Sequence, residues 1–291
     1  MESNVRVVEP RFVLGVDEFA ACVGEARRVG KWEAWKNGYF ESFRGVFQPM
    51  LDIVYQFELD GLKPYVEALD FDASLRVARQ FIADGGVDRV RAAFDRCIEA
   101  LPPVASFPVY LIVGIGHANG MALPAAEPYV FLGLELSGEA AAGLDGLIAH
   151  EYNHLARVQA FYGNIDPLSL TVGDFAISEG LATVFALSLL GQELSPETIA
   201  ASVSNLGDPA SAVEREPEMR ADLLAHWDHV ANREMIDRFV GSGTVYLVGG
   251  LMIARLVDEG HDALELTRTP PDELSEVIRT TLVAGGSGDL T

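Results

Sequence analysis

The segment His150-Glu151-Tyr152-Asn153-His154 places two histidines four residues apart, with a glutamate directly after the first. On an α-helix this spacing stacks both imidazoles on one face, where they can bind a single metal ion. The adjacent glutamate can then address a water molecule bound to that ion. Random placement would produce such an HExxH segment in roughly one chain in a hundred of this composition. The segment therefore predicts a metal site that activates water.

The helix expected around this motif turns Glu151 toward the interior of the protein. At about 100° per residue, the apolar side chains form one stripe, with Glu151 in its middle and His154 at its margin. The stripe consists of Leu144, Leu147, Ile148, Leu155, Val158 and Phe161. An uncompensated buried carboxylate is costly. We therefore expect either a buried arginine or lysine beside Glu151 or a bound dication with its water.

A catalytic zinc site needs three protein ligands and one open position. A histidine six residues after His154 would complete the metzincin pattern, but that position is Ala160. Further along, Glu179 is an isolated glutamate in the apolar segment Phe175–Leu190, where the other polar side chains are hydroxyls. A metal between two helices would compensate both buried glutamates. We expect Glu179 to be the third zinc ligand, and the alternative is an ordinary salt bridge.

The segment His150–His154 followed by Ile177–Ala182 (ISEGLA) resembles the gluzincin peptidases, in which an HExxH helix is joined by a glutamate on the next helix. The wider layout, over roughly residues 105–260, is similar to a bacterial family described as predicted Zn-dependent proteases. This resemblance implies a zinc metallopeptidase that binds one Zn²⁺ per chain through His150, His154 and Glu179, and that uses Glu151 as general base.

One position departs from the gluzincin pattern. Some gluzincins carry an aspartate one turn after the third ligand, where it orients a histidine, but this chain has Thr183 there. Metal-bound histidines usually donate their other N–H to such a partner. Asp145 and Asp174 are the remaining candidates for that role.

The expected reaction begins with a zinc-bound water whose pKa is lowered toward about 7. Glu151 accepts the proton as this water attacks a peptide carbonyl, and passes it to the leaving amine. The oxyanion needs a donor besides zinc. Tyr246 is the first candidate because neighbouring glycines allow close approach to a cleft, and His226 and His229 follow. His117, in the GHANG loop, is expected to line the cleft.

The element pattern predicts an α+β fold that is mostly α. Two short runs of β-type residues, Phe107–Val113 and Tyr129–Glu135, precede a long helix from Ser137 to Tyr162. A second long helix is expected from Gly173 to Leu190, since glycine marks its end. We expect Tyr129–Glu135 to be an edge strand that could bind an extended peptide through backbone hydrogen bonds.

Composition suggests how the chain is divided. Apolar residues recur at helical spacing up to Glu99, and this pattern ends at Leu101-Pro102-Pro103. We therefore expect a helical N-terminal region, residues 1–104, before a zincin-like catalytic domain with a small sheet and an active-site helix, residues 105–291. The two could also form one continuous domain.

The charge balance limits the partners of the protein. With 43 acidic and 21 basic residues, the formal net charge of −22 repels phosphate backbones and anionic lipids. We expect no nucleic acid and no membrane partner. The first thirty residues lack an export signal, so a cytoplasmic location is expected. Cys22 and Cys97 are expected to be buried, reduced thiols.

Two alternatives to a peptidase remain open at this stage. The first is a zinc amidase that acts on small substrates. The second is a zinc-bearing interaction or stress-response module with weak or lost catalysis, against which the intact HExxH glutamate argues. The substrate, the choice between endo- and exopeptidase action, and the oligomeric state are not set by the sequence.

Overall fold

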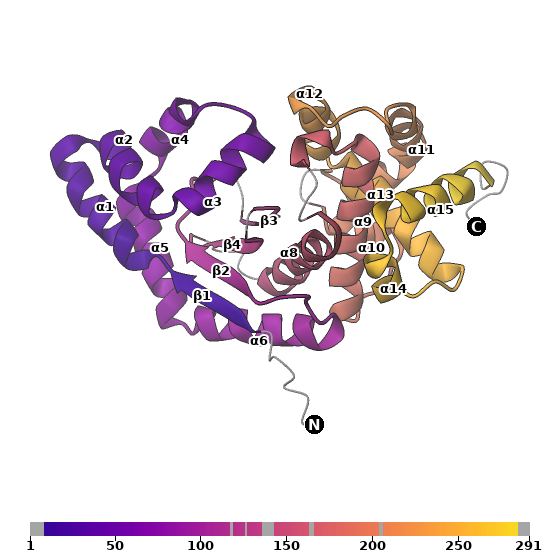
Figure 1. Ribbon diagram of the computed structural model, residues 1–291, viewed down its shortest axis with the longest axis horizontal. Helices are drawn as coiled ribbons and strands as arrows, with labels where there is room; N and C mark the ends of the chain where they lie inside the picture. The colour runs from indigo at the N-terminus through magenta and orange to yellow at the C-terminus, as the bar shows by residue number, and fades with distance from the viewer. Residues whose placement is uncertain are drawn as a thin grey trace. The chain divides into compact units, whose positions relative to one another are not determined.

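A computed structural model describes residues 9–116, 119–125, 127–135, 143–162, 166–203 and 206–284 (Figure 1). Helices make up most of the described chain, and four strands form one small sheet. The predicted α+β, mostly helical fold class is therefore confirmed. Both cysteines are free and buried, as expected, and burial raises the pKa of each thiol to about 12.

The chain divides into two compact units, residues 1–159 and 160–291. The sheet of the first unit includes β1 (Pro10–Leu14), which lies within the region expected to be helical. A short strand that lacks alternating burial gives little periodic signal, which is why the sequence did not reveal it. An independent helical region ending at residue 104 stays a prediction.

The first unit contains a helical layer whose aromatic residues form its core. Trp32, Trp35, Tyr39, Phe40 and Phe47 are all buried, as their helical spacing predicts. The helices are α1 (Val16–Val29), α2 (Lys31–Ala34), η1 (Trp35–Phe40), α3 (Arg44–Pro49), η2 (Met50–Tyr55), η3 (Leu59–Leu62), α4 (Lys63–Ala68), α5 (Phe71–Ala83), α6 (Gly86–Ala100) and α8 (Leu144–Arg157). The π-helical turn η4 (Val158–Tyr162) continues α8.

The sheet has the strand order β1-β2-β4-β3. The strands β2 (Phe107–Ile112) and β4 (Tyr129–Gly133) are the two that the sequence predicts. β1 pairs with β2, and β2 with β4, in parallel, whereas β3 (Gly120–Leu123) pairs with β4 in antiparallel orientation. The expectation that Tyr129–Glu135 forms an edge strand is wrong, because β3 covers that side of β4. The segment between β2 and β4 contains three glycines and was therefore expected to be only a loop.

The helix α8, which carries the HExxH segment, is anchored to α6 and to the sheet. Asp145, in its first turn, pairs with Arg89 and Arg96 of α6. The hydroxyl of Tyr152 donates to the carbonyl oxygen of Leu101 at 2.5 Å, and its ring packs against Phe94 and Phe107. Figure 1 shows α8 beside the sheet, where it contacts β3. These contacts fix the rotation of α8 and therefore the direction of its histidines.

The second unit consists of helices around an apolar core. After the short turn η5 (Pro167–Ser169), these are α9 (Val172–Leu189), α10 (Pro196–Ala201), α11 (Pro209–Ala225), α12 (Arg233–Met235), η6 (Ile236–Val240), α13 (Thr244–Asp258), α14 (Ala263–Arg268) and α15 (Pro271–Ala284). α9 begins with a capping box, in which Thr171 and Asp174 each bond to the backbone N–H of the other. The predicted helix from Gly173 to Leu190 is thus confirmed within a residue at each end.

The helices α9 and α13 touch backbone to backbone through two glycines. A Cβ added at Gly180 would lie 2.3 Å from the carbonyl oxygen of Gly249, and a Cβ added at Gly249 would lie 2.1 Å from that of Ala176. Any larger residue at either position would push the helices apart. Because Glu179 directly precedes Gly180, this crossing determines where the Glu179 backbone lies in the second unit.

Length and composition would allow α9 to cross a membrane, and 67% of its apolar window is buried inside the protein. Core helices of soluble proteins pass the same test.

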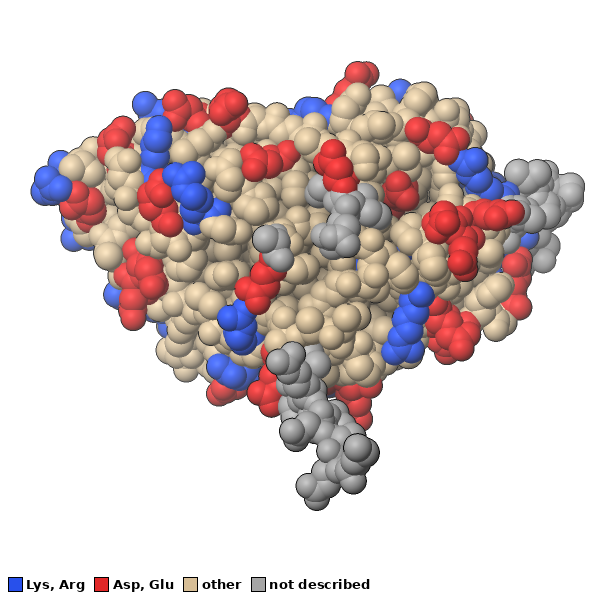
Figure 2. Space-filling model, in the orientation of Figure 1, with Lys and Arg blue, Asp and Glu red and all other residues tan. Residues whose placement is uncertain are grey.

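Acidic side chains are scattered over the face shown in Figure 2 and alternate with basic ones. The charge is therefore distributed over that face, as the sequence suggests.

Replacing Gly249 with alanine should lower the free energy of unfolding by about 3 kcal/mol, the upper part of the usual range for overpacking. The new Cβ would meet a backbone oxygen that cannot rotate away. Urea denaturation measures the change. Gly24→Ala is the control, because Gly24 lies exposed in α1 with nothing within 4 Å of an added Cβ. That variant should gain about 0.5–1 kcal/mol. Equal stability of Gly249→Ala and the wild type would contradict the crossing.

Candidate metal centre

His150 and His154 turn their imidazoles toward a common point. Their Nε2 atoms lie 3.0 Å apart, and the two rings stand nearly perpendicular with centroids 4.7 Å apart. Two nitrogens that bind one tetrahedral zinc at 2.0–2.1 Å are separated by about 3.3 Å. The observed separation is close to that value. The four-residue spacing in α8 therefore places the two nitrogens as a shared metal would require.

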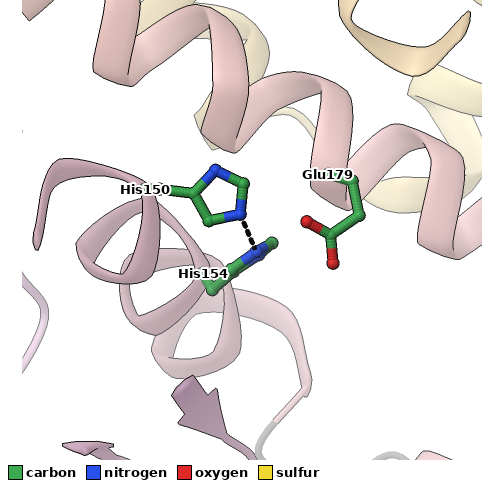
Figure 3. Close-up of side chains that lie close together, drawn as sticks. All are labelled: His150, His154 and Glu179. Atoms are coloured by element: carbon green, nitrogen blue, oxygen red, sulfur yellow. Dashed lines mark hydrogen bonds between the residues drawn. The ribbon is translucent and has the colours of Figure 1, made fainter. Parts of the chain in front are cut away.

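Glu179, on α9, completes the group. Ligand atoms of His150, His154 and Glu179 all lie within 4.8 Å of one another (Figure 3). Figure 3 shows the Glu179 carboxylate directed toward the two imidazoles. Over the described part of the chain, this is the one group of three or more His, Cys, Asp or Glu residues with donor atoms arranged to hold a metal ion. Two imidazoles and one carboxylate form a donor set that fits zinc and leaves a fourth position for water.

Glu151 is a buried carboxylate next to His150, with 8% of its surface exposed. Its side chain lies against the edge strand, because a Cβ added at Gly120 would come within 3.2 Å of Glu151 Cγ. Glu151 is not part of the three-residue ligand group. It directly follows His150 in the sequence and lies outside that group, and its role as a base stays a prediction.

A buried cation lies on the same helix. Arg157 is fully buried, three residues after His154. A buried Glu151 requires either a cationic side chain or a bound dication to compensate its charge. Arg157 and Glu151 are six residues apart and do not share a face of the helix, so burial alone does not decide between the two. The assignment of a metal rests instead on the convergence of His150, His154 and Glu179.

The aspartates expected to orient the histidines have other contacts. Asp145 bonds to Arg89 and Arg96 across the α6–α8 packing, and Asp174 caps α9 together with Thr171. Both serve helix ends, as acidic residues in a first turn often do, so the proposed orienting role is wrong for both. Thr183 is buried and packs against Gly250 of α13. The position at which some gluzincins carry the orienting aspartate is therefore used here for packing between α9 and α13.

Tyr246 lies on α13, one turn before Gly249, and is half-buried against the apolar core of the second unit. Residues three apart share a face of a helix, and Gly249 faces α9. Tyr246 therefore also faces the helix that carries Glu179. The proposed role of its hydroxyl stays a prediction.

His226 and His229 lie in the segment that runs beside the start of α9. The backbone N–H of Val172 donates to the carbonyl oxygen of His229 at 2.9 Å. His226 directs Nδ1 to the carbonyl oxygen of Asp222 at 2.8 Å, and its ring lies 5.1 Å from that of His229. Arg238 holds the same Asp222 through both carboxylate oxygens. His226 is thus engaged in a surface network, whereas His229 is exposed.

His117 lies outside the described residues, so its expected place along a cleft stays a prediction. Two features near the motif were missed by the sequence analysis. One is the strand β3, which brings Gly120 against Glu151. The other is Glu135, whose carboxylate accepts the backbone N–H of Gly114 at 2.8 Å. The sequence signal that could have identified Glu135 was an acidic residue at the end of an apolar strand.

Part of the chain matches a known protein family. A family model described as "Predicted Zn-dependent protease" matches residues 101–207. This stretch begins just before β2 and ends after α10, so it contains the HExxH helix and Glu179. No curated protein and no solved structure matches the chain. The match supports a zinc protease family for this part of the chain and leaves the mechanism and substrate open.

Protein purified without added metal should contain about one zinc ion per chain, since three donors converge on one point. Replacing Glu179 with glutamine should weaken zinc retention by about 10-fold or more. Elemental analysis after dialysis against a graded chelator measures both. Glu193→Gln is the control, because Glu193 is an exposed glutamate beyond the end of α9. A protein that neither contains nor binds zinc would refute the site. Unchanged retention in Glu179→Gln would remove Glu179 from the ligand set.

Proposed function

We propose that this chain is a zinc-dependent metallopeptidase of the gluzincin type. The observation that carries the proposal is the convergence of His150, His154 and Glu179 within 4.8 Å, with the buried Glu151 directly beside the first ligand in sequence. The family match over residues 101–207 supports the same reaction class. The proposed substrate is a peptide or protein, and the proposed location, as expected from the sequence, is cytoplasmic.

His150, His154 and Glu179 would hold the metal. A bound Zn²⁺ would supply Lewis acidity and would lower the pKa of a water molecule to about 7. Glu151 would accept a proton from the attacking water and transfer it to the nitrogen of the leaving amine. The burial of Glu151 keeps competing bulk water away from that transfer. Because Glu151 is not one of the ligands, its carboxylate remains able to move the proton.

The edge strand β3 supports a peptide as the substrate. The backbone N–H of Gly133 donates to the carbonyl oxygen of Asn119 at 2.9 Å, so these two residues form a hydrogen-bonded pair of the antiparallel ladder. Such pairs recur at every second residue. With the observed register, the backbone groups of Gly120 and Ala122 therefore point away from β4. An extended peptide could pair with these groups.

The position of β3 relative to Glu151 connects this binding to the reaction. Gly120 lies against the Glu151 side chain, so a peptide paired with the start of β3 would have its backbone beside the proposed base. Gly120 has no side chain that would obstruct this approach. We propose β3, in place of the strand Tyr129–Glu135, as the strand that aligns the substrate.

Replacing Glu151 with glutamine should keep zinc and fold but reduce turnover by about 10²-fold or more, the usual scale of general-base catalysis. The amide keeps the shape of the side chain and cannot accept the proton. The measurement is kcat on a peptide selected from a library digest, together with zinc content. Full activity in this variant would refute the role of Glu151. A wild type that hydrolyses small amides and no library peptide would instead indicate an amidase.

Replacing Tyr246 with phenylalanine should lower kcat and kcat/KM together by roughly 10²-fold, with KM little changed, if its hydroxyl donates to the oxyanion. The ring stays packed, so fold and zinc content should survive. His226→Ala and His229→Ala are measured in parallel. The substitution that depresses kcat without loss of zinc identifies the donor. An unchanged kcat in Tyr246→Phe removes Tyr246 from the mechanism.

A further inference from the structure

Glu135 directs its carboxylate into the protein just after β4. Its Oε1 atom is shielded from solvent, and Oε2 accepts the backbone N–H of Gly114 at 2.8 Å. Burial raises the pKa of this carboxyl, while the backbone N–H groups of Gly114, Glu135 and Gly116 oppose that rise. An acidic side chain that binds backbone N–H groups in this way fixes the conformation of the segment that carries them.

Two glycines make room for this carboxylate. A Cβ added at Gly114 would lie 2.7 Å from Oε1, and a Cβ added at Gly133 would lie 3.1 Å from Oε2. Neither glycine has a positive φ, so left-handed backbone does not explain the residue type at either position. The Glu135 carboxylate lies where a Cβ would come too close, and this explains the glycine at both positions. The backbone at both positions is thus shaped around Glu135.

The segment that Glu135 holds leads directly to β3. The hydroxyl of Tyr39 accepts the N–H of Val113 at 2.8 Å, and it lies 3.1 Å from the Val113 carbonyl oxygen, to which it donates. On the side nearer β3, Gly133 donates to the carbonyl oxygen of Asn119. The chain between β2 and β3 is therefore fixed at its start by Tyr39 and Glu135, and at its end by β4.

We propose that Glu135 is a positioning residue of the peptidase site. Its carboxylate also lies against Gly133, whose N–H binds the carbonyl oxygen of Asn119 at the start of β3. Glu135 thereby sets where β3 begins, and β3 in turn places Gly120 against Glu151 and presents Gly120 and Ala122 to the substrate. This inference rests on the proposed function, because the position of β3 matters for catalysis only if a peptide pairs with it. Misplacement of a reacting group by about 1 Å can cost on the order of 10²-fold in rate.

The test compares Glu135→Ala with Glu135→Gln. The glutamine keeps one oxygen that can accept the Gly114 N–H, so it should retain activity within a few-fold of the wild type. The alanine should lower kcat/KM on an extended peptide by about 10-fold or more, with zinc content unchanged. Glu127→Ala is the matched control, since Glu127 is an exposed carboxylate just before β4, paired with Arg11 on the surface. It should behave as wild type.

Hydrogen exchange separates a positioning role from a general loss of stability. In Glu135→Ala, the amides of Met121 and Leu123, which face β4 in the ladder, should exchange at least 10-fold faster, while those of α6 and α5 stay unchanged. Unchanged exchange in β3, or a uniform rise across the first unit, would overturn the inference. This measurement needs no substrate. If exchange rises only in β3 of Glu135→Ala and the wild type cleaves no peptide, the proposed function is refuted. The conclusion that Glu135 fixes the position of β3 would then still stand.

Discussion

The proposed metal site depends on one geometric constraint, which is that two imidazole nitrogens and one carboxylate must reach the same point in space. The four-residue spacing of His150 and His154 meets the first part within a single helix, and the Nε2 atoms lie 3.0 Å apart. The third donor has to come from another helix. Its backbone position in the second unit is set by the contact of Gly180 with Gly249, where added side chains would overlap backbone atoms. The EGLA glycine thus serves the metal site indirectly, by allowing two helices to touch.

The same helix that supplies two ligands also connects the site to the sheet. Tyr152 ties α8 to the end of α6, and Glu151 lies against the first residue of β3. The sheet therefore brings together the proposed base and the strand edge that would align a peptide. Glu135 fixes the start of the chain that forms this edge. The two histidines, the proposed base and the strand proposed to align the substrate are thus linked through contacts of α8 and its neighbours in the first unit.

Local spacing was sufficient to predict the HExxH helix, the strands β2 and β4, and the helix that carries Glu179. These features depend on periodicity and on glycine or threonine at helix ends, which a sequence displays directly. The strand β3 was missed because Gly114, Gly116 and Gly120 give the segment the composition of a loop, and its strand character comes from pairing with β4. The orienting roles assigned to Asp145 and Asp174 were wrong because both residues serve helix ends. The burial of Arg157 on α8 was also not predicted, because spacing alone does not indicate that a basic side chain is buried.

Anomalous X-ray diffraction at the zinc absorption edge, from crystals of the protein purified without added metal, shows directly whether the three residues hold zinc. We expect one strong peak per chain, about 2.0–2.2 Å from Nε2 of His150, Nε2 of His154 and a carboxylate oxygen of Glu179. A peak held by other residues, such as His226 and His229, would contradict it. So would the absence of any peak after zinc is added in excess.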